Sequence, residues 1–199
     1  MKILVTAFEP FGGESINAAL EAVTRLSAPK DAELYKLTVP TVFGLCTETT
    51  VKAIREIKPD AVVCVGQAAG RAAVTPERVA VNLRDARIPD NAGFQPVDEP
   101  VVPGGPAAYF STLPVRDMTE AVQKAGVSSM ISNTAGTFVC NDLFYGIRHS
   151  IESEFPSISG GFIHVPCLPE QAASYSSPVP SMDLEKIVTG LEAALETLL

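Results

Sequence analysis

The sequence contains few of the residues that carry metal or redox chemistry. Among its 199 residues there is no tryptophan, and there are only two histidines and four cysteines. The cysteines lie far apart in the chain, which excludes the paired spacing of zinc ribbons and of CxxC redox motifs. The sequence shows no secretory signal, so we expect reduced thiols in a cytoplasmic protein and no metal site. The four cysteines are Cys46, Cys64, Cys140 and Cys167.

The chain also lacks the features of nucleic-acid-binding and membrane proteins. It has 15 Lys and Arg against 23 Asp and Glu, a formal net charge of −8, and no basic cluster that could follow a phosphate backbone. No apolar run approaches the roughly 18 residues of a membrane span. We therefore expect no nucleic-acid partner and no membrane. With 46% hydrophobic and 19% charged residues, the composition is that of a folded chain.

Strand-like and helix-like segments alternate along most of the chain. Strands are predicted at residues 2–6, 33–39, 61–65, 79–83, 127–132 and 161–165, and helices at 16–26, 44–57, 115–124, 140–154 and 184–198. The apolar run at 61–65 is typical of a strand buried on both faces of a parallel sheet. The alternation predicts a single α/β domain over residues 1–199. Its three α/β/α layers would surround a twisted central sheet that is mostly parallel and partly mixed.

Residues 84–106 interrupt this alternation. They contain five prolines and three glycines and show neither helical nor strand periodicity. A loop of this length inside a compact domain is usually functional. We expect the segment to form a flap over the active site.

Cys140 is the first candidate for chemistry. In open α/β sheets, sites collect at the carboxyl ends of the strands, and Cys140 lies between an expected strand and an expected helix. If Thr137 caps that helix, Cys140 sits in the first turn, where the helix dipole lowers the pKa of a thiol. The free N–H groups of the same turn could hold an oxyanion. The alternative is a small buried residue with no chemical role.

A cysteine nucleophile needs a base, and the sequence offers two histidines. His149 follows Cys140 by nine residues on the same helix. That spacing places it on the opposite helix face and about 13.5 Å further along, so we expect it to face solvent near the helix end. His164 lies at the end of an apolar strand. By elimination, His164 is the imidazole base.

An acid that orients the histidine would complete a triad. Asp142 is two residues from Cys140 and should point to another side of the helix. Spacing does not choose among the remaining acids near the expected strand ends. The acids considered are Glu9, Glu14, Glu77, Asp85, Asp90 and Asp142.

The turn at residues 8–13 is the other glycine-rich feature. It precedes Ser15, which we expect to cap the first helix. The turn has neither the lysine of a P-loop nor the spacing of GxGxxG, so it gives little support for a nucleotide site. Its aromatic residues, Phe8 and Phe11, could form the walls of a site for a small flat ligand, or they could belong to the core.

Six motifs, in order along the chain, resemble one known family. They are residues 6–13 (TAFEPFGG), 65–67 (VGQ), 76–82 (PERVAVN), 85–91 (DARIPDN), 133–141 (NTAGTFVCN) and 162–166 (FIHVP). The chain resembles pyroglutamyl peptidase type I, also called pyrrolidone-carboxylate peptidase, which is a cysteine peptidase family. The ordered set is far more specific than any one motif.

The resemblance implies an enzyme that removes the N-terminal pyroglutamyl residue from peptides. It implies an acyl-enzyme on Cys140, with His164 as general base and acid and Glu77 orienting His164. Arg87 would lie beside the reacting carbonyl. A cytoplasmic homotetramer without metal or organic cofactor is also expected. The implied pocket for the substrate ring consists of Phe8, Phe11, Gln67, Ile88, Phe138 and Val139.

Three positions depart from what the family leads us to expect. Asp142 stands where relatives more often have histidine, and we expect its charge to raise the pKa of Cys140 slightly. Ala69 replaces a glycine, and Cys167 replaces an apolar aromatic residue. None of these departures touches the implied triad.

Two other functions remain as alternatives. A noncatalytic relative that binds a small molecule would keep the fold, but Cys140, His164 and Glu77 are all intact. A phosphorylase-like α/β enzyme would use the 8–13 turn as an anion site, but that turn contains no Lys or Arg.

Overall fold

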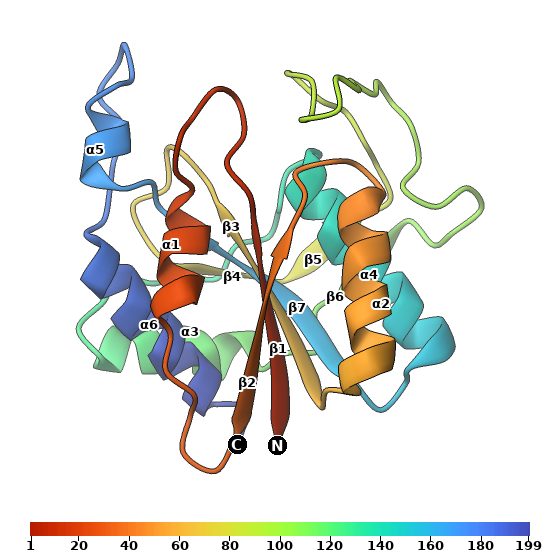
Figure 1. Cartoon of the computed structure of the whole chain (residues 1–199), viewed down its shortest axis with the longest axis horizontal. Coiled ribbons are helices and arrows are strands. Elements are labelled where there is room, and N and C mark those ends of the chain that lie inside the picture. Colours follow the sequence, from red (N-terminus) through yellow and green to blue (C-terminus); the bar gives the residue numbers. More distant parts are fainter.

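A twisted five-stranded sheet runs through the middle of the molecule (Figure 1). The computed structural model describes residues 1–199. The strand order is β2-β1-β3-β7-β4. The strands are β1 (Lys2–Phe8), β2 (Glu33–Val39), β3 (Ala61–Gln67), β4 (Thr75–Glu77) and β7 (Ser159–Val165). Four of them are parallel, and β4 pairs antiparallel with β7 at the sheet edge, which confirms the predicted mostly parallel, partly mixed sheet.

Helices cover both faces of the sheet and give the three predicted layers. On one side in Figure 1 lie α1 (Ala18–Arg25), α3 (Val115–Lys124) and α6 (Leu184–Glu196). The other side carries α2 (Leu45–Ile57) and α4 (Val139–Glu154). Three short elements complete the chain: β5 (Val79–Val81), β6 (Ala108–Phe110) and α5 (Pro169–Ala172).

The sheet separates two hydrophobic cores. Along β3, Val63 and Val65 point into the core beneath α1, α3 and α6, whereas Val62 and Cys64 point into the core beneath α2 and α4. Both faces of the strand are therefore buried, which explains its continuous apolar sequence. Full burial of each valine side chain stabilises the fold by roughly 1.5–3 kcal/mol.

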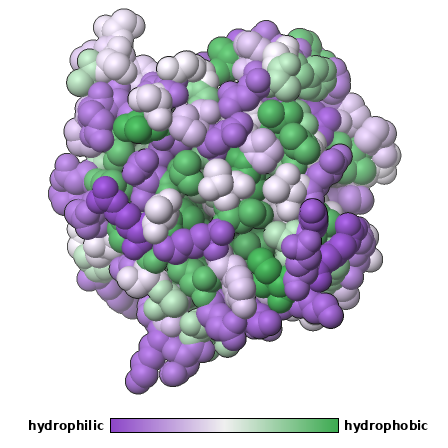
Figure 2. Space-filling model, viewed as in Figure 1, coloured by the Kyte–Doolittle hydropathy of each residue, from purple (hydrophilic) through white to green (hydrophobic).

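The outer surface is mixed in character. Figure 2 shows hydrophilic and hydrophobic residues interspersed on one face of the molecule. None of the helices combines the length and the hydrophobicity that a transmembrane span needs.

Two local predictions were wrong. The cap of α1 is Asn17 rather than Ser15, because the Asn17 carboxamide accepts the Ala19 N–H at 3.0 Å. Residues 127–132 do not form a strand; they touch the sheet only through isolated bridges at Ser129 and Ser132. Serine side chains here compete for backbone groups, since the Ser129 hydroxyl donates to the Val74 carbonyl at 2.8 Å.

The long loop at residues 84–106 contains no helix or strand, as its sequence predicted. It is nevertheless tied down by hydrogen bonds. The buried Asp90 carboxylate accepts the N–H groups of Phe43, Ala92 and Phe94 at 2.9–3.0 Å. Asn91 donates to Glu9 and to the Pro10 carbonyl, so this loop is attached to the 8–13 turn.

Candidate active site

The edge strand β4 places an acid against a histidine. In its antiparallel pairing with β7, Thr75 lies opposite His164 and Glu77 lies opposite Phe162. The Nδ1 atom of His164 lies 2.7 Å from Oε1 of Glu77, and these residues are 3% and 0% exposed. Since an ionised carboxylate only accepts hydrogen bonds, Nδ1 carries the hydrogen and Nε2 is left as the basic nitrogen.

Cys140 lies above the neighbouring strand. It occupies the first turn of α4, whose N-cap is Phe138 rather than Thr137 and whose start has no side-chain cap. A Cβ atom placed on Gly66 would lie 2.9 Å from the Cys140 sulfur, so the thiol sits directly over Gly66. Gly66 pairs with His164 in the parallel β3–β7 ladder, where adjacent strands are about 4.8 Å apart. The structure therefore gathers Cys140, His164 and Glu77 at the carboxyl edge of the sheet.

The surroundings favour the neutral forms of both Cys140 and His164. Burial, and secondarily the charge of Glu77, raises the pKa of Cys140 to about 12, and the charge of Arg71 opposes this rise. Burial also lowers the pKa of His164, against the opposing effect of Glu77. The lowered thiol pKa expected from the helix start is thus reversed by desolvation. Although its thiol is largely desolvated, Cys140 is the only one of the four cysteines that is partly exposed.

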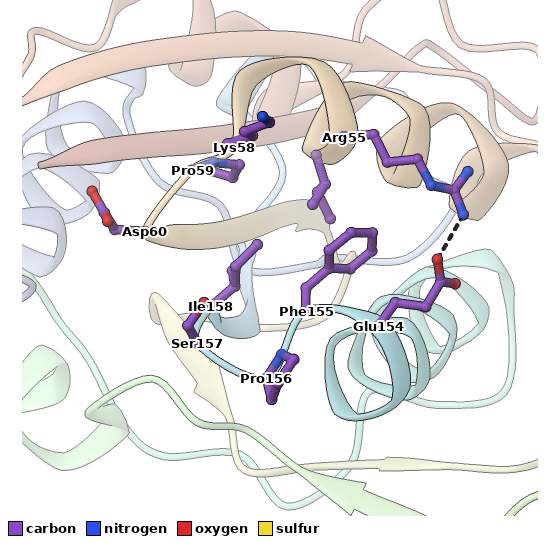
Figure 3. A pocket seen from close by; sticks show the side chains of 10 residues that line it. Arg55, Lys58, Pro59, Asp60, Glu154, Phe155, Pro156, Ser157 and Ile158 are labelled. Carbon is purple, nitrogen blue, oxygen red and sulfur yellow. Dashed lines mark hydrogen bonds and ion pairs between the residues drawn. The ribbon is translucent and has the colours of Figure 1, made fainter.

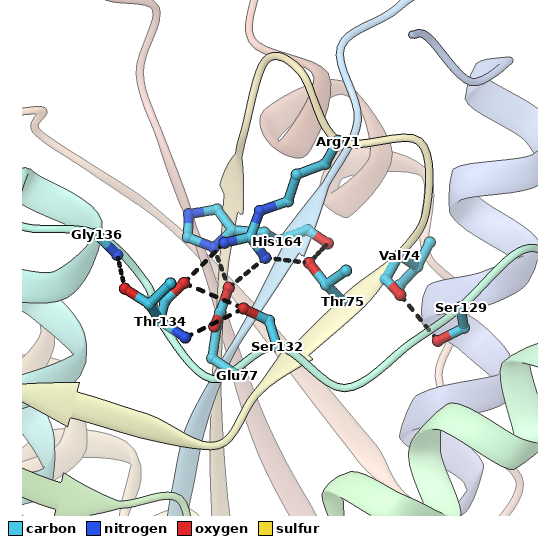
Figure 4. A network of polar contacts seen from close by, with 9 residues as sticks. All are labelled: Arg71, Val74, Thr75, Glu77, Ser129, Ser132, Thr134, Gly136 and His164. Carbon is cyan, nitrogen blue, oxygen red and sulfur yellow. Dashed lines mark hydrogen bonds and ion pairs between the residues drawn. The ribbon is translucent and has the colours of Figure 1, made fainter.

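Arg71 joins this group from the segment after β3 (Figure 4). Its Nη1 atom lies 2.6 Å from Glu77 Oε1 and 2.6 Å from the Thr75 hydroxyl. Its Nη2 atom donates to the Thr134 carbonyl at 2.8 Å. The sequence analysis missed both Arg71 and Gly66. The available signal was a glycine and an arginine within six residues of the end of the apolar run at 61–65, where sites collect.

Aromatic rings lie beside the start of α4. Phe138 packs against Phe11 with ring centroids 6.1 Å apart, and against Phe43 edge-on at 5.4 Å. Phe43 in turn contacts Phe94 from the long loop at 6.0 Å. Phe43 and Phe94 were not foreseen from the sequence. Of the two aromatic residues in the 8–13 turn, Phe11 belongs to this group.

The other expected pocket residues have different surroundings. Phe8 and Val139 are 2% and 1% exposed and belong to the core beneath α2 and α4, where Phe8 packs against Phe162. The Gln67 side chain lies on the opposite sheet face, where its Oε1 accepts the Ala18 N–H at 2.7 Å and the Gln171 amide at 3.0 Å. Only its backbone is therefore left for a ligand on the Cys140 side.

Arg87 and Ile88 are exposed residues near the start of the long loop. The Asp85 N–H donates to the Thr137 carbonyl at 3.0 Å, and the Thr137 hydroxyl donates to the Asp85 carbonyl at 2.8 Å. These bonds hold the start of the loop beside the segment that leads into α4. Arg87 and Ile88 thus lie near the candidate site without a fixed partner of their own.

Comparison with known proteins agrees with this geometry. A family model described as pyroglutamyl peptidase matches residues 1–199. This chain belongs to the pyroglutamyl peptidase family. It is therefore an enzyme of the cysteine peptidase class of hydrolases, and the implied family resemblance is confirmed.

Individual family members are similar over nearly the whole chain. A pyrrolidone-carboxylate peptidase of Levilactobacillus brevis is 54% identical over 100% of this chain and 97% of the relative. A second, from Vibrio campbellii, is 56% identical over 96% of this chain and 89% of the relative. The crystal structure of Bacillus amyloliquefaciens pyroglutamyl peptidase I has a TM-score of 0.95 at 48% identity, covering 98% of this chain and 95% of that one.

The aspartate at position 142 has charged and polar partners of its own. The buried Asp142 carboxylate contacts Arg84 Nε at 2.5 Å and accepts the Gly44 N–H at 2.7 Å. Its charge is thus compensated, and it does not contribute to the raised pKa of Cys140. The expected effect of Asp142 on the nucleophile was wrong, because the side chain points toward α2 as the helix geometry predicted.

His149 is partly exposed, so the prediction that it faces solvent holds only in part. Its Nδ1 atom lies 2.9 Å from the Tyr109 hydroxyl, and its ring stacks on Tyr145 with centroids 6.3 Å apart. These contacts attach α4 to β6. As the helix spacing predicted, His149 takes no part in the group around Cys140.

One cavity of the molecule is not connected with this chemistry. A cavity of about 510 Å³ lies where α2 and α4 end, lined by residues 54–55, 58–60 and 154–158 (Figure 3). It contains an Arg55–Glu154 ion pair at 2.8 Å but no cysteine or histidine. It adjoins the beginning of β3, whereas Cys140 lies near the carboxyl end of that strand.

The 8–13 turn does not resemble an anion site. The Glu9 carboxylate lies there and accepts the Thr41 N–H at 3.3 Å and the Asn91 amide at 3.0 Å. A negatively charged side chain in this place disfavours a bound phosphate. The phosphorylase-like alternative therefore gains no support.

Proposed function

We propose that this enzyme hydrolyses the bond after an N-terminal pyroglutamyl residue of peptides, with Cys140 as nucleophile, His164 as general base and acid, and Glu77 as the residue that orients His164. The proposal rests on one observation above the others. A buried Glu77–His164 hydrogen bond of 2.7 Å lies beside the only cysteine that is partly exposed. The relatives, which are pyrrolidone-carboxylate and pyroglutamyl peptidases by name, add the substrate class.

In the first step the thiol and the imidazole start in their neutral forms. His164 Nε2 takes the thiol proton as the sulfur attacks the pyroglutamyl carbonyl carbon. The resulting oxyanion can be held by the N–H groups that open α4, which have no side-chain cap. Collapse of this intermediate breaks the C–N bond, and His164 gives its proton to the leaving amine.

In the second step water replaces the leaving peptide. His164 removes a proton from the water as its oxygen attacks the thioester carbonyl. The C–S bond then breaks, the thiol regains its proton, and free pyroglutamate leaves. Glu77 stays ionised throughout and stabilises the imidazolium that forms in each step.

Recognition of the ring follows from its chemistry. Pyroglutamate is a neutral lactam, so apolar walls and a few amide hydrogen bonds suit it. Phe11 and Phe138 are suited to form those walls above a floor that includes Phe8 and Val139. Ordinary N-terminal residues carry an ammonium group, which such a pocket would have to desolvate at a high free-energy cost.

The remaining expectations belong to the same proposal. Residues 84–106 would cover the bound ring, with Ile88 beside it, Arg87 near the reacting carbonyl and the Gln67 backbone as a hydrogen-bonding group. The family resemblance adds a cytoplasmic homotetramer. Exposed apolar side chains such as Phe110, Met130 and Val97, at 68%, 61% and 66% exposure, support contacts between copies.

The test compares two chromogenic amides. A pyroglutamyl amide and a prolyl amide differ by the lactam carbonyl and by the ammonium charge of proline. We expect rapid hydrolysis of the pyroglutamyl amide, at least ~10³-fold slower hydrolysis of the prolyl amide, and complete loss of activity after thiol alkylation. Activity that survives alkylation, or equal rates on both amides, would contradict the proposal.

A further inference from the structure

We propose that Arg71 is a positioning residue for this reaction: it fixes Glu77 in the orientation that His164 requires and links that acid to the loop in front of Cys140. The inference rests on the proposed function, because it assigns a role within the same mechanism. Arg71 would touch neither substrate nor the reacting atoms. It would act through Glu77.

The first support is the way in which the Glu77 carboxylate is held. Its Oε1 atom accepts from two donors, His164 Nδ1 at 2.7 Å and Arg71 Nη1 at 2.6 Å. Its Oε2 atom is buried and has no hydrogen-bond partner. Without the guanidinium, the imidazole would be the only group that fixes this carboxylate. Arg71 therefore supplies a second hydrogen bond, and the two bonds together fix the orientation of the Glu77 carboxylate.

The second support is what the rest of the guanidinium contacts. Arg71 also binds the Thr75 hydroxyl at 2.6 Å and the Thr134 carbonyl at 2.8 Å. Thr134 belongs to the loop that leads into α4, and its hydroxyl accepts the Gly136 N–H at 3.1 Å. One side chain thus connects the strand that carries the acid with the segment that leads to the nucleophile, as Figure 4 shows.

The third support is charge. Glu77 is fully buried, and the side chain of Arg71 is 24% exposed. The charged or titratable groups around this carboxylate are Arg71, His164 on β7 and Cys140 on α4, and Cys140 in turn adjoins Cys64 on β3. Arg71 is the only permanent cation among them. A buried carboxylate without compensating donors is strongly disfavoured. In an Arg71 variant, only the hydrogen bond from His164 would be left to keep Glu77 ionised.

The charge of Arg71 should also affect how the activity and the alkylation of Cys140 depend on pH. The charge of Arg71 lowers the pKa of Cys140 and that of His164, in each case as a smaller effect than burial. Loss of that charge should raise both pKa values. His164 must be neutral to accept a proton, so the acid limb of the pH profile should move to higher pH. Alkylation of Cys140 needs the thiolate, so its inflection should also move to higher pH.

The experiment uses Arg71→Met and Arg71→Lys, with Arg78→Met as the matched control. Arg78 follows Glu77 directly and donates to the Asn133 side chain at 2.6 Å, so it holds the same loop without contacting the acid. For each folded variant, kcat and KM on a pyroglutamyl amide and the rate of Cys140 alkylation are measured against pH.

We expect Arg71→Met to lower kcat by roughly 10–100-fold, as loss of an outer-shell partner often does, with KM changed less than threefold. Both pH inflections should move upward. Arg71→Lys should keep the wild-type inflections, because the charge remains, and should recover only part of kcat, because an ammonium cannot reproduce the planar fork. Arg78→Met should match the wild type in rate and in pH profile.

Two results would overturn the inference. One is a folded Arg71→Met variant with wild-type kcat and unchanged inflections; the other is an equal loss of kcat in the Arg71 and Arg78 variants without any pH shift. If Arg71→Met does not fold, Arg71→Lys decides: a reduced kcat supports the inference and a wild-type kcat contradicts it. Failure of the wild type to hydrolyse the amide would instead reject the proposed function.

Discussion

At the scale of single residues, the central feature is a nucleophile and a base that both rest in the neutral state. Burial raises the pKa of Cys140 and lowers the pKa of His164, and Glu77 opposes the second shift. A preformed thiolate–imidazolium pair is therefore not favoured before substrate binds. The proton should move during attack, with Glu77 stabilising the cation as it appears.

Replacing each of the two histidines by alanine should have very different effects on the rate of hydrolysis. His164→Ala should lower hydrolysis by at least ~10³-fold, because no other base adjoins Cys140. At neutral pH this variant should also be alkylated more slowly at Cys140. Burial raises the pKa of that thiol, and without His164 no neighbouring base would accept its proton. His149→Ala should leave the rate within a few-fold. That variant should lose about 1–3 kcal/mol of stability, because the Tyr109 hydrogen bond and the Tyr145 stacking disappear.

The measurements are the hydrolysis rate, the pH dependence of alkylation and the free energy of unfolding, all in both variants. An inactive His149→Ala protein that is still folded, together with an active His164→Ala protein, would show that the roles have been assigned to the wrong histidines.

At the scale of elements, the site depends on one short strand running against the others. In β4 the antiparallel direction brings Thr75 and Glu77 onto the face that carries His164 and Phe162. The first turn of α4 then places Cys140 over Gly66, where a side chain larger than hydrogen would collide with the sulfur. The acid, the base and the nucleophile thus come from β4, β7 and α4, with β3 as the surface beneath the thiol.

The long loop at residues 84–106 should be both a cover and the first site of proteolysis. Its inner part is anchored by Asp90 and Asn91, while residues 92–95 and 97–100 are exposed. We expect limited proteolysis to cut first within the exposed stretches. A bound pyroglutamyl inhibitor should slow that cleavage, because the loop would then pack on the ligand.

Cleavage is followed by mass mapping of the fragments with and without inhibitor. The exposed Ser/Pro segment at residues 174–178 serves as the internal control, since it lies in another loop and should be cut at the same rate in both samples. First cleavage elsewhere, or equal protection of both segments, would contradict a cover that closes over the site.

At the scale of the whole molecule, the hydrophobic periodicity of the sequence was enough to predict the three layers but not the short strands β4 and β6. Helix and strand periodicity gave α2, α3, α4 and α6 nearly to the residue, and the apolar run gave β3. The three-residue strands β4 and β6 were missed, because they are too short for an alternation to be visible and are set by tertiary pairing. The expected strand at 127–132 failed for the same reason, since only two isolated bridges form there.

The site was predictable in part. Elimination on one helix selected His164 over His149, whereas the choice of Glu77 came only from the family resemblance. Its position depends on β4, which the sequence pattern did not reveal. Gly66 and Phe43 were missed because each acts through a contact distant in sequence. Arg71 was missed because its bond to Glu77, six residues further on, depends on how the chain turns between β3 and β4. From the sequence alone, the charge of Asp142 was expected to raise the pKa of Cys140, because the sequence could not show that Arg84, 58 residues away, pairs with this carboxylate.

The central claim is that Cys140 performs the reaction, and the most direct measurement is hydrolysis of a pyroglutamyl amide by Cys140→Ser beside Cys167→Ala. Both side chains are thiols near the carboxyl edge of the sheet, but Cys167 is buried and donates to the Pro180 carbonyl at 3.3 Å. We expect Cys140→Ser to remain folded and to lose at least ~10³-fold in rate, and Cys167→Ala to retain the chemical step. Full activity of a folded Cys140→Ser protein would contradict the account.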